Sequence, residues 1–491
     1  MTQNEEKTGF ISHLVELRER LIHCLIFLFV AFIICYFFSE HVYGFLVEPY
    51  SSAVKDDGVE RRLIFTALQE TFLTYIKVSF FAAFFITSPF ILIQIWKFIA
   101  PGLYNNEKKA LLPYLIATPV LFLLGGILFG QKDRPRDLGL QIGLFNTGSW
   151  NAITDVKGVE VGHETLIYGD SVRTGVTIIK PHGRNLFKEK VMGAVYVTNG
   201  FGKALGFTQV EELGTIETPI GLTNTLNIFM VANSIVDYMI ETNPKIRSVN
   251  PVVGETNDSG LNDIQGRHVT KEHVFRAIKN AKSGPVLEGS VGAGTGTRAL
   301  GFKGGIGTSS RVLPKESGGF TVGVLVQTNF GGSLMINGAP VGRELSKSPF
   351  ESTIPYDEDE GSCMIVIATN APLSNRNLKR MAKRVDHAFG RVGAYSSNGS
   401  GDYVIIFSTA NLSSSNKKIV MREELKNRYM NGLFAATVEA TEEAIINSLF
   451  MAETVNSRYG RMESLPVNKT IKILKKYKAL YWNEKLYPWK K

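Results

Sequence analysis

Residues 355–374 read PYDEDEGSCMIVIATNAPLS and join an acidic loop directly to an apolar strand. The run from Asp357 to Glu360 is typical of a solvated loop, whereas 363–369 has the length and β-branched content of a buried strand. Ser362 stands between them, directly after Gly361. Two interpretations are open. Ser362 either caps the turn into the strand, or it becomes a new N-terminus when the Gly361–Ser362 bond is cut, with hydroxyl nucleophile and amine base on one residue.

Composition changes sharply along the 491 residues. Apolar segments at about 21–38, 72–95 and 110–130 each approach or exceed the roughly 18–20 residues that cross a hydrocarbon core. After them the sequence becomes glycine-rich with ordinary charge. We therefore expect a membrane domain with three spans over 1–130 and a second domain over 131–491.

Charge, cysteine content and motifs argue against a nucleic-acid-binding protein, a disulfide-rich protein and a zinc protein. The net charge of +9 does not indicate nucleic-acid binding, because Lys and Arg are mixed with acidic residues and gather only at the C-terminus. The three cysteines suggest no disulfide framework. No HExxH motif and no Cys/His cluster with zinc spacing occurs. We expect no metal and no cofactor.

The second domain alternates short β-rich runs with helical stretches, which predicts an α/β or α+β fold. The clearest strands are VMGAVYVTN (191–199), FTVGVLVQTN (320–329), CMIVIAT (363–369) and YVIIFST (403–409). Helices are expected over 268–283 and 371–389. The glycine-rich stretch 291–311 follows no clear strand and opens no helix, so it favours close backbone packing near a pocket over a dinucleotide site.

Small polar residues stand at the edges of the expected strands. They are Asn329, Ser362, Ser400 and Asp402. Taken singly, each is typical of a turn. No G-x-S-x-G elbow accompanies them, because Asn398 stands where its first glycine would be.

Taken together, these residues match a known family. The segments 151–166, 217–225, 250–263, 291–311, 361–374 and 398–409 resemble, in order, the DmpA-type aminopeptidases, which include L-aminopeptidase/D-esterases and β-peptidyl aminopeptidases. The resemblance implies an α+β fold of the αββα sandwich type. It also implies a serine aminopeptidase whose precursor cuts itself between Gly361 and Ser362.

The resemblance implies a role for each polar residue. Ser362 is the nucleophile, and its freed α-amine, with a reference pKa of about 8, shuttles the proton. Asn329 donates to the developing oxyanion. Ser400 and Asp402 correspond to the serine and acidic residue that orient the nucleophile and bind the ammonium group of the substrate. Asp402 stands where better-known members carry Glu, one methylene longer. Cys363 is expected in the core, because alternation along a strand turns its side chain away from that of Ser362.

The membrane domain resembles the first half of TatC, the receptor of the twin-arginine translocase. The matching stretches are HLVELRERL (13–21), EP (48–49) and SPFILIQIWKFIAPGLYNNEKK (88–109). By position, Glu16 and Glu107 match the carboxylates that bind the paired arginines of a signal peptide, for which bidentate carboxylates are well suited. The alternative for Glu16 is a pair with Arg20, one helical turn further on.

The combined expectation is a multi-pass protein of the bacterial inner membrane, a self-cleaving aminopeptidase that acts on peptides, amides or esters. A homo-oligomer is expected, with Tat subunits and twin-arginine signal peptides as further partners. The resemblance to TatC implies a cytoplasmic N-terminus, and an odd number of spans then places the peptidase in the periplasm. The basic flank KDRPR (132–136) favours the cytoplasm instead. The alternatives are a TatC-type export subunit and an artificial join of two neighbouring genes.

Overall fold

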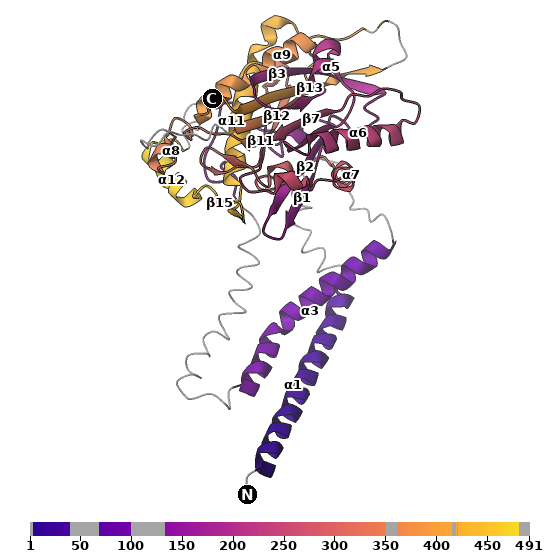
Figure 1. The fold of residues 1–491 in the computed structure, drawn as a ribbon, viewed down its shortest axis with the longest axis vertical. Coiled ribbons are helices and arrows are strands. Elements are labelled where there is room, and N and C mark those ends of the chain that lie inside the picture. Colours follow the sequence, from indigo (N-terminus) through magenta and orange to yellow (C-terminus); the bar gives the residue numbers. More distant parts are fainter. Residues whose placement is uncertain are drawn as a thin grey trace. The chain divides into compact units, whose positions relative to one another are not determined.

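Figure 1 shows the fold in a computed structural model of the chain. The residues that it describes are 3–39, 68–99, 133–349, 361–414, 419 and 421–480. The chain divides into two compact units, Met1–Gln131 and Lys132–Lys491.

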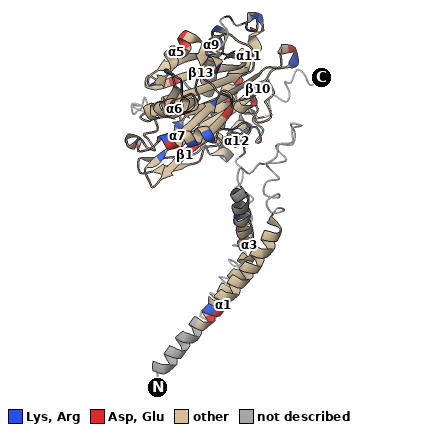
Figure 2. Cartoon of the chain, turned by 90° about the vertical axis from the view of Figure 1, so that its right-hand side faces the viewer, with Lys and Arg blue, Asp and Glu red and all other residues tan. Residues whose placement is uncertain are grey.

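Two long helices make up the described part of the first unit. They are α1 (Gln3–Phe37) and α3 (Leu68–Ile99), which contain the first two expected spans. The two helices touch where the rings of Phe27 and Phe90 stack, with their centroids 4.2 Å apart. Lys, Arg, Asp and Glu occur in α1 only as far as Arg20, and the remainder of the helix carries none (Figure 2).

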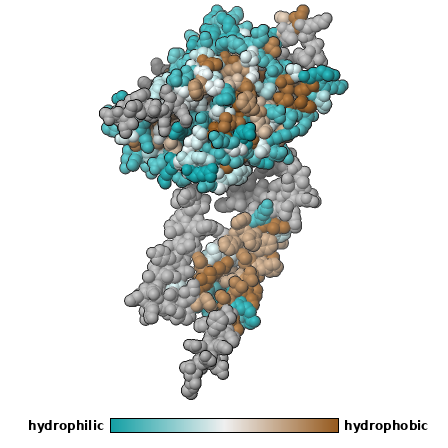
Figure 3. Space-filling model, viewed as in Figure 1, coloured by the Kyte–Doolittle hydropathy of each residue, from teal (hydrophilic) through white to brown (hydrophobic). Residues whose placement is uncertain are grey.

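Among the described residues, one helix meets the requirements of a membrane span. The stretch Val15–Phe37 of α1 is long and apolar enough to cross a bilayer, and its apolar side chains are exposed (brown in Figure 3). The apolar stretch of α3, Ile86–Phe98, is shorter than a span. The third expected span, 110–130, lies outside the described residues. The prediction of three spans is therefore not confirmed.

Two mixed β-sheets form the centre of the second unit. The five-stranded sheet has the order β1 (Glu160–Tyr168), β2 (Val172–Lys180), β6 (Ile220–Asn224), β7 (Val252–Thr256) and β4 (Ala204–Leu205). The six-stranded sheet has the order β10 (Ile306–Val312), β11 (Thr321–Asn329), β12 (Gly361–Thr369), β13 (Ser400–Ser414), β3 (Glu189–Gly200) and β5 (Thr215–Ile216).

Helices cover the outer face of each sheet (Figure 1). The five-stranded sheet packs against α6 (Ile228–Thr242) and α7 (Lys271–Lys279), and the six-stranded sheet against α9 (Asn375–Ala382), α10 (Val385–Val392) and α11 (Asn431–Phe450). A third apolar core lies between the two sheets. The four layers form the expected αββα sandwich.

Shorter elements complete the second unit. They are α5 (Phe207–Leu213), the hairpin β8 (Arg298–Ala299) and β9 (Phe302–Lys303), α8 (Val341–Glu344), the hairpin β14 (Val455–Ser457) and β15 (Gly460–Met462), and α12 (Val467–Lys476).

The central position of β12 in its sheet explains why residues 363–368 are all apolar. Met364, Val366 and Ala368 face the core between the sheets, whereas Cys363, Ile365 and Ile367 face the helices. Both faces of β12 are buried, so no polar alternation is needed. This alternation places Cys363 in the core as expected and turns Ser362 toward the space between the sheets. The sheets lie close together, since a Cβ built on Gly254 would lie 2.1 Å from the Met364 side chain.

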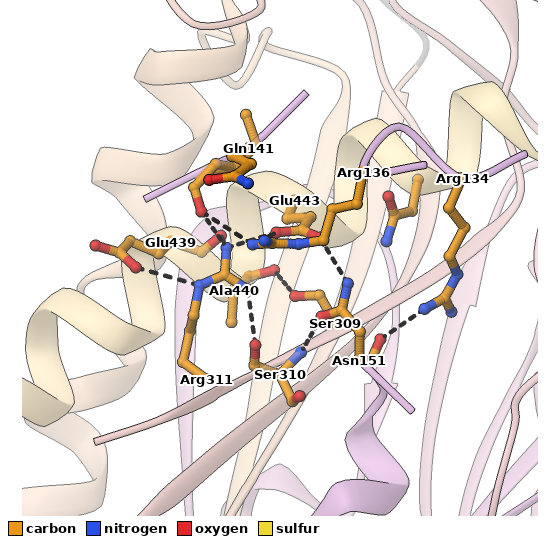
Figure 4. A network of polar contacts seen from close by, with 12 residues as sticks. Arg134, Arg136, Gln141, Asn151, Ser309, Ser310, Arg311, Glu439, Ala440 and Glu443 are labelled. Carbon is orange, nitrogen blue, oxygen red and sulfur yellow. Dashed lines mark hydrogen bonds and ion pairs between the residues drawn. The ribbon is translucent and has the colours of Figure 1, made fainter. Parts of the chain in front are cut away.

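A buried ion network lies at the end of the six-stranded sheet where β12 ends (Figure 4). Arg311 of β10 is fully buried, and its Nη2 lies 2.6 Å from Oε2 of Glu443 on α11. Its Nε donates to Oε2 of Glu439, one helical turn earlier, at 3.2 Å. These bonds join the edge of the sheet to the covering helix.

The start of the second unit is part of the same network (Figure 4). Arg136 donates to both oxygens of Glu443, at 2.6 and 2.7 Å. Asn151 Nδ2 also donates to Glu443, at 2.6 Å, and Arg134 pairs with the buried Glu288 at 2.6 Å. Two basic residues of the KDRPR flank are thus held by buried carboxylates of the folded second unit.

Candidate active site

Antiparallel pairing of β11 and β12 brings Ser362 and Asn329 together. They are direct register partners at the end of the two strands, and both are almost completely buried. The Asn329 amide donates from Nδ2 to Ser362 Oγ at 3.3 Å. Its Oδ1 accepts a hydrogen bond from the backbone N–H of Arg298 at 3.1 Å. Because the oxygen is held in this way, the amide nitrogen faces the serine.

A second donor reaches the same oxygen from the opposite sheet. The backbone N–H of Asn257, just after β7, donates to Ser362 Oγ at 3.3 Å. A turn fixes this residue, since Ser259 N–H donates to Asn257 Oδ1 at 2.9 Å. The sequence analysis missed Asn257, because a backbone donor leaves no signal in the type of its side chain.

The turn after β7 is anchored by a buried carboxylate. Asp258 is 1% exposed and accepts from Thr174 Oγ1 at 2.6 Å and from Asn262 Nδ2 at 3.0 Å. Burial raises the pKa of Asp258 to about 6, although these hydrogen bonds lower it. Asp258 therefore ties the turn that carries Asn257 to strand β2.

Ser400 lies beside the bond that is expected to be cut. In the parallel pair of β12 and β13, Ser400 is the register partner of Gly361. A Cβ built on Gly361 would lie 2.9 Å from Ser400 Oγ, so a larger residue at this position would have to displace the Ser400 side chain. The hydroxyl of Ser400 donates to Asp402 Oδ1 at 2.8 Å.

Asp402 lies on the other face of the sheet from Ser362. It is the register partner of Cys363, and it is 1% exposed. Its Oδ2 has no hydrogen-bond partner among the described residues. Burial raises the pKa of Asp402, and the hydrogen bond from Ser400 lowers it. In the structure Asp402 contacts Ser400 and does not line the pocket beside Ser362.

A pocket of about 500 Å³ opens beside Ser362. It is lined by Phe201, Gly202, Lys203, Thr225, Glu255, Asn257, Gly361, Ser362, Asn398 and Gly399. A cavity of this size falls within the usual range for small-molecule sites. Ser362 and Asn257 line the pocket, whereas Asn329 contacts Ser362 without being one of the lining residues.

Glu255 supplies the negative charge of this pocket. It is buried, and it accepts from Lys203 N–H at 3.0 Å and from the hydroxyl of Thr225. Burial raises the pKa of Glu255, while these hydrogen bonds and the charge of Lys203 lower it. The sequence analysis missed Glu255. An acidic residue near the end of a strand is typical of a turn, and only the structure shows that Glu255 lines a pocket.

The arrangement is suited to acyl transfer. A hydroxyl oxygen receives two N–H donors, beside a pocket that carries a carboxylate. Donors this close to the attacking oxygen can reach the oxygen of the carbonyl group that it attacks, which is where the oxyanion forms. Among the described residues, no group of His, Cys, Asp and Glu side chains could hold a metal ion.

In the first unit, Glu16 pairs with Arg20. The Arg20 Nη2 lies 2.6 Å from Glu16 Oε1, and Arg20 also donates to Gln94 of α3 at 3.3 Å. The alternative that the sequence left open for Glu16 is thus present in the structure. Glu107 lies outside the described residues.

Comparison with known proteins identifies the second unit. Residues 151–463 match the model of peptidase family S58. The chain belongs to peptidase family S58. It is 40% identical over 381 residues to the β-peptidyl aminopeptidase BapA of Sphingosinicella microcystinivorans. The aligned region covers 73% of this chain and 96% of BapA.

Solved structures share the fold of the S58 domain. The L-aminopeptidase D-Ala-esterase/amidase of Ochrobactrum anthropi, a serine aminopeptidase with a variant of the Ntn-hydrolase fold, is 36% identical with a TM-score of 0.66, covering 71% of this chain and 99% of that one. A β-aminopeptidase of Burkholderia sp. is 41% identical with the same TM-score, over 70% of this chain and 99% of that one. The S58 domain is therefore a hydrolase of the aminopeptidase class with a mixed α/β Ntn-hydrolase fold.

The first unit carries a TatC domain. Residues 12–130 match the model of the Sec-independent protein translocase protein TatC. Over 124 residues the chain is 48% identical to TatC of Magnetococcus marinus, covering 25% of this chain and 45% of that protein. The chain thus spans about half the length of the TatC proteins that it matches. This domain, with its apolar helix α1, supports a membrane location.

Proposed function

We propose that the protein is a membrane-anchored aminopeptidase that cuts itself between Gly361 and Ser362 and then uses Ser362 as an N-terminal nucleophile. The observation that carries the proposal is the convergence of the Asn329 amide and the Asn257 N–H on Ser362 Oγ, with Ser400 beside Gly361. The relation to aminopeptidases of family S58 supports the reaction class.

The first step is an acyl shift within the precursor. Ser362 Oγ attacks the carbonyl carbon of Gly361, and the peptide bond to the Ser362 nitrogen breaks as an ester to Oγ forms. The hydroxyl proton passes to the leaving nitrogen, which becomes the α-amine. Water then hydrolyses the ester, which leaves a carboxylate on Gly361 and a free α-amine on Ser362. Asn329 and Asn257 stabilise the oxyanion in each attack.

The mature enzyme repeats this chemistry on its substrate. The Ser362 amine takes the proton from Oγ as the oxygen attacks the substrate carbonyl, and passes it to the leaving amine or alcohol. Water hydrolyses the acyl-enzyme and releases the N-terminal amino acid. Ser400, held by Asp402, positions the amine in this proposal, because its hydroxyl lies close to Gly361, the residue before Ser362.

Glu255 is the group that binds the substrate ammonium in this proposal. It is the carboxylate that lines the pocket, whereas Asp402 faces the other side of the sheet. An ammonium held by Glu255 directs the first amino acid of a peptide, amide or ester into the pocket of about 500 Å³. Substrates with a blocked amine are therefore expected to be poor.

The self-cleavage is tested with the full chain in detergent. Gel electrophoresis and N-terminal sequencing are expected to show a fragment that begins Ser-Cys-Met-Ile and comprises residues 362–491. The Ser362→Ala chain is expected to stay whole and to lose hydrolysis of alanine p-nitroanilide. Cys363→Ala is the matched control, because its side chain faces the core and its chain is expected to be cut as usual.

An active preparation that consists of one uncut chain would contradict the mechanism. Cleavage in the Ser362→Ala variant would do the same, since it would show that another group or another protease breaks the bond.

The TatC domain favours a second function, participation in twin-arginine export at the bacterial inner membrane. The match at 12–130 carries this proposal, with Glu16 and Glu107 as binding residues and with Tat subunits and signal peptides as partners. Crosslinking of a twin-arginine signal peptide to the wild-type chain, and its loss in Glu107→Gln, tests it. An unchanged crosslink in Glu107→Gln argues against this role.

A periplasmic position of the peptidase follows from an odd number of spans. The basic flank 132–136 opposes it less than its charge suggests, because Arg134 and Arg136 are held by carboxylates of the folded S58 domain. Alkaline phosphatase fused after Pro135, which keeps Lys132 and Arg134 of the basic flank, is expected to be active. Activity of a cytoplasmic reporter at this place would overturn the assignment and favour two spans or joined genes.

Two further points have direct tests. A homo-oligomer is expected, and light scattering of the cleaved protein measures it. A chymotryptic peptide from cells that covers residues 130–138 would show that the two domains are made as one chain. Separate termini on both sides of Gln131 would indicate two genes.

A further inference from the structure

The glycine-rich loop that follows the 3₁₀ turn Gly292–Gly294 packs its backbone against the active-site strands. A Cβ built on Gly294 would lie 2.4 Å from Ile306 N, and one on Gly304 would lie 2.8 Å from Thr328 O. Thr328 N–H donates to Gly305 O at 3.0 Å. The loop is therefore fixed to β11 one residue before Asn329.

A buried lysine lies at the centre of this loop. Lys303 is fully buried, and its Nζ donates to Gly294 O at 2.8 Å and to Gly304 O at 2.7 Å. Thr297 Oγ1 donates to the same Gly294 oxygen at 3.1 Å. The amine of Lys303 thus joins two points of the loop that are ten residues apart in number, 294 and 304.

The hairpin β8–β9 connects this lysine to the oxyanion donor. Arg298 and Lys303 are direct register partners, and the backbone N–H of Arg298 donates to Asn329 Oδ1 at 3.1 Å. The Asn329 amide then donates from Nδ2 to Ser362 Oγ. The contacts run without a break from the lysine to the serine oxygen.

Burying an amine has a cost that surface residues avoid. Burial lowers the pKa of Lys303 to about 7, and the nearby charge of Asp258 opposes this effect. Both the charged and the neutral amine can donate two hydrogen bonds, so the bridge between the loop carbonyls persists in either state. The role that these contacts indicate for Lys303 is therefore structural: its amine holds the two loop carbonyls in place.

We propose that Lys303 is a positioning residue: its buried amine fixes the glycine-rich loop, and the loop in turn aims the Asn329 amide at the carbonyl oxygen of the group that Ser362 attacks. This inference rests on the proposed function and adds to it the element that orients the oxyanion donor.

The first test replaces Lys303 by Met in the full chain, which removes the amine and keeps the length of the side chain. We expect kcat for alanine p-nitroanilide to fall about 10- to 100-fold, because small displacements of a catalytic donor have effects of this size. KM is expected to stay within about twofold, since an interaction made only in the transition state is lost.

A double-mutant cycle separates positioning from general damage. Asn329→Ala alone is expected to lower kcat about 10²- to 10³-fold. If Lys303 acts through Asn329, then Lys303→Met adds less than about threefold in the Asn329→Ala background, because residues that act as one unit are not additive. Losses that multiply in the double variant overturn the inference, and so does full kcat in Lys303→Met.

Two further variants keep the test decisive. Arg136→Met removes a half-buried cation that pairs with the buried Glu443 in the distant ion network, and it is expected to lower the melting temperature while kcat stays within about twofold. If Lys303→Met does not fold, Thr297→Val perturbs the same loop more mildly and is expected to show a smaller loss with the same lack of additivity. Additive losses in Thr297→Val overturn the inference.

Failure of the proposed function has a different result. Absence of turnover in the wild-type chain, or turnover that persists in Ser362→Ala, overturns the proposed function and the Lys303 inference with it. Wild-type turnover that depends on Ser362, combined with an unaffected Lys303→Met, overturns the Lys303 inference alone.

Discussion

The two ends of the six-stranded sheet are both polar and buried, but they are built in opposite ways. At the end of β10, Arg311 meets Glu439 and Glu443 in full ion pairs, with distances of 2.6 to 3.2 Å. At the other end, Ser362 meets neutral amide donors at 3.3 Å. Arg311 thus makes short charged contacts, whereas Ser362 Oγ receives two long hydrogen bonds from neutral donors.

The difference concerns how completely each group is satisfied. Glu443 accepts from Arg136, Asn151 and Arg311. At the other end, Asp402 Oδ2 has no partner among the described residues. The donors to Ser362 Oγ make long hydrogen bonds, and they can bond more strongly to an oxyanion that forms beside this oxygen. A satisfied network stabilises a fold, whereas an incompletely satisfied one leaves interactions for the transition state.

The comparison predicts first that the charged end carries stability. Arg311→Met leaves Glu439 and Glu443 with fewer partners, and removal of one partner of a buried ion pair costs about 3–5 kcal/mol. Thermal unfolding of the full chain in detergent, followed by near-UV circular dichroism, measures the loss. Lys379→Met is the control: it breaks the exposed pair with Glu211 and is expected to cost about 0–1 kcal/mol. Equal losses in the two variants would remove the distinction.

The neutral end is expected to carry activity. Asn329→Ala should lower kcat about 10²- to 10³-fold, and self-cleavage should slow as well, because an oxyanion donor is lost. Initial rates with alanine p-nitroanilide measure this effect. Asn370 is a matched control at the other end of β12, since its Oδ1 accepts from Thr321 N–H, and Asn370→Ala should leave kcat unchanged. A drop in kcat for Asn370→Ala of similar size would contradict the assignment.

The pocket carboxylate gives a third, smaller effect. Glu255→Gln is expected to raise KM for substrates with a free amine about 10- to 100-fold, since a hydrogen bond to a charged group contributes roughly 1.5–3 kcal/mol. Asp402→Asn should change KM less, because Asp402 faces away from the pocket. Comparison of free and N-acetylated substrates tests both roles. A larger KM change in Asp402→Asn would return the ammonium site to Asp402.

The stability contributed by the ion network and by the active-site region is expected to depend on pH in opposite directions. Burial alone would raise the pKa of Glu443, but the charges of Arg311 and Arg136 lower it from 4.5 to about 2. The stability that Glu443 contributes is therefore present above about pH 4.5 and is lost as the pH falls through about 2. Glu443→Gln should flatten this part of the stability curve.

Asp258, near the active site, is expected to act in the opposite direction. Burial raises its pKa from 3.8 to about 6, so its contribution is present below pH 3.8 and is lost as the pH rises through about 6. Unfolding free energies of wild type and Asp258→Asn between pH 3 and 7 measure the difference. Wild type is expected to lose stability relative to Asp258→Asn as the pH rises through about 6. A gain of wild type relative to the variant over this range would contradict the sign.

The sequence predicted the strands better than the contacts between them. CMIVIAT forms β12 because both its faces are buried, and the other three quoted runs correspond to β3, β11 and β13. The expected single helix over 371–389 is instead α9 and α10, which are separated at Lys383 and Arg384 without a glycine or proline to mark the break.

Only part of the candidate site could be predicted from the sequence. Ser362 and Asn329 stand at strand ends in the sequence, and their pairing depends on a register that no local pattern sets. Asn257 and Glu255 come from the other sheet and could be found only once the sheets were packed. Arg311 is typical of a surface residue until Glu443, 132 positions away, is placed beside it.

The position of β12 has a consequence for the lifetime of the enzyme. β12 lies between β11, which precedes the proposed cut, and β13, which follows it, and β13 pairs with β3 from before the cut. A precursor that unfolds keeps these strands on one tether, at high effective concentration. Once cut, an unfolded molecule is two separate chains, and refolding becomes a bimolecular reaction that slows on dilution. The mature protein would then persist by its slow rate of opening and not by its ability to refold.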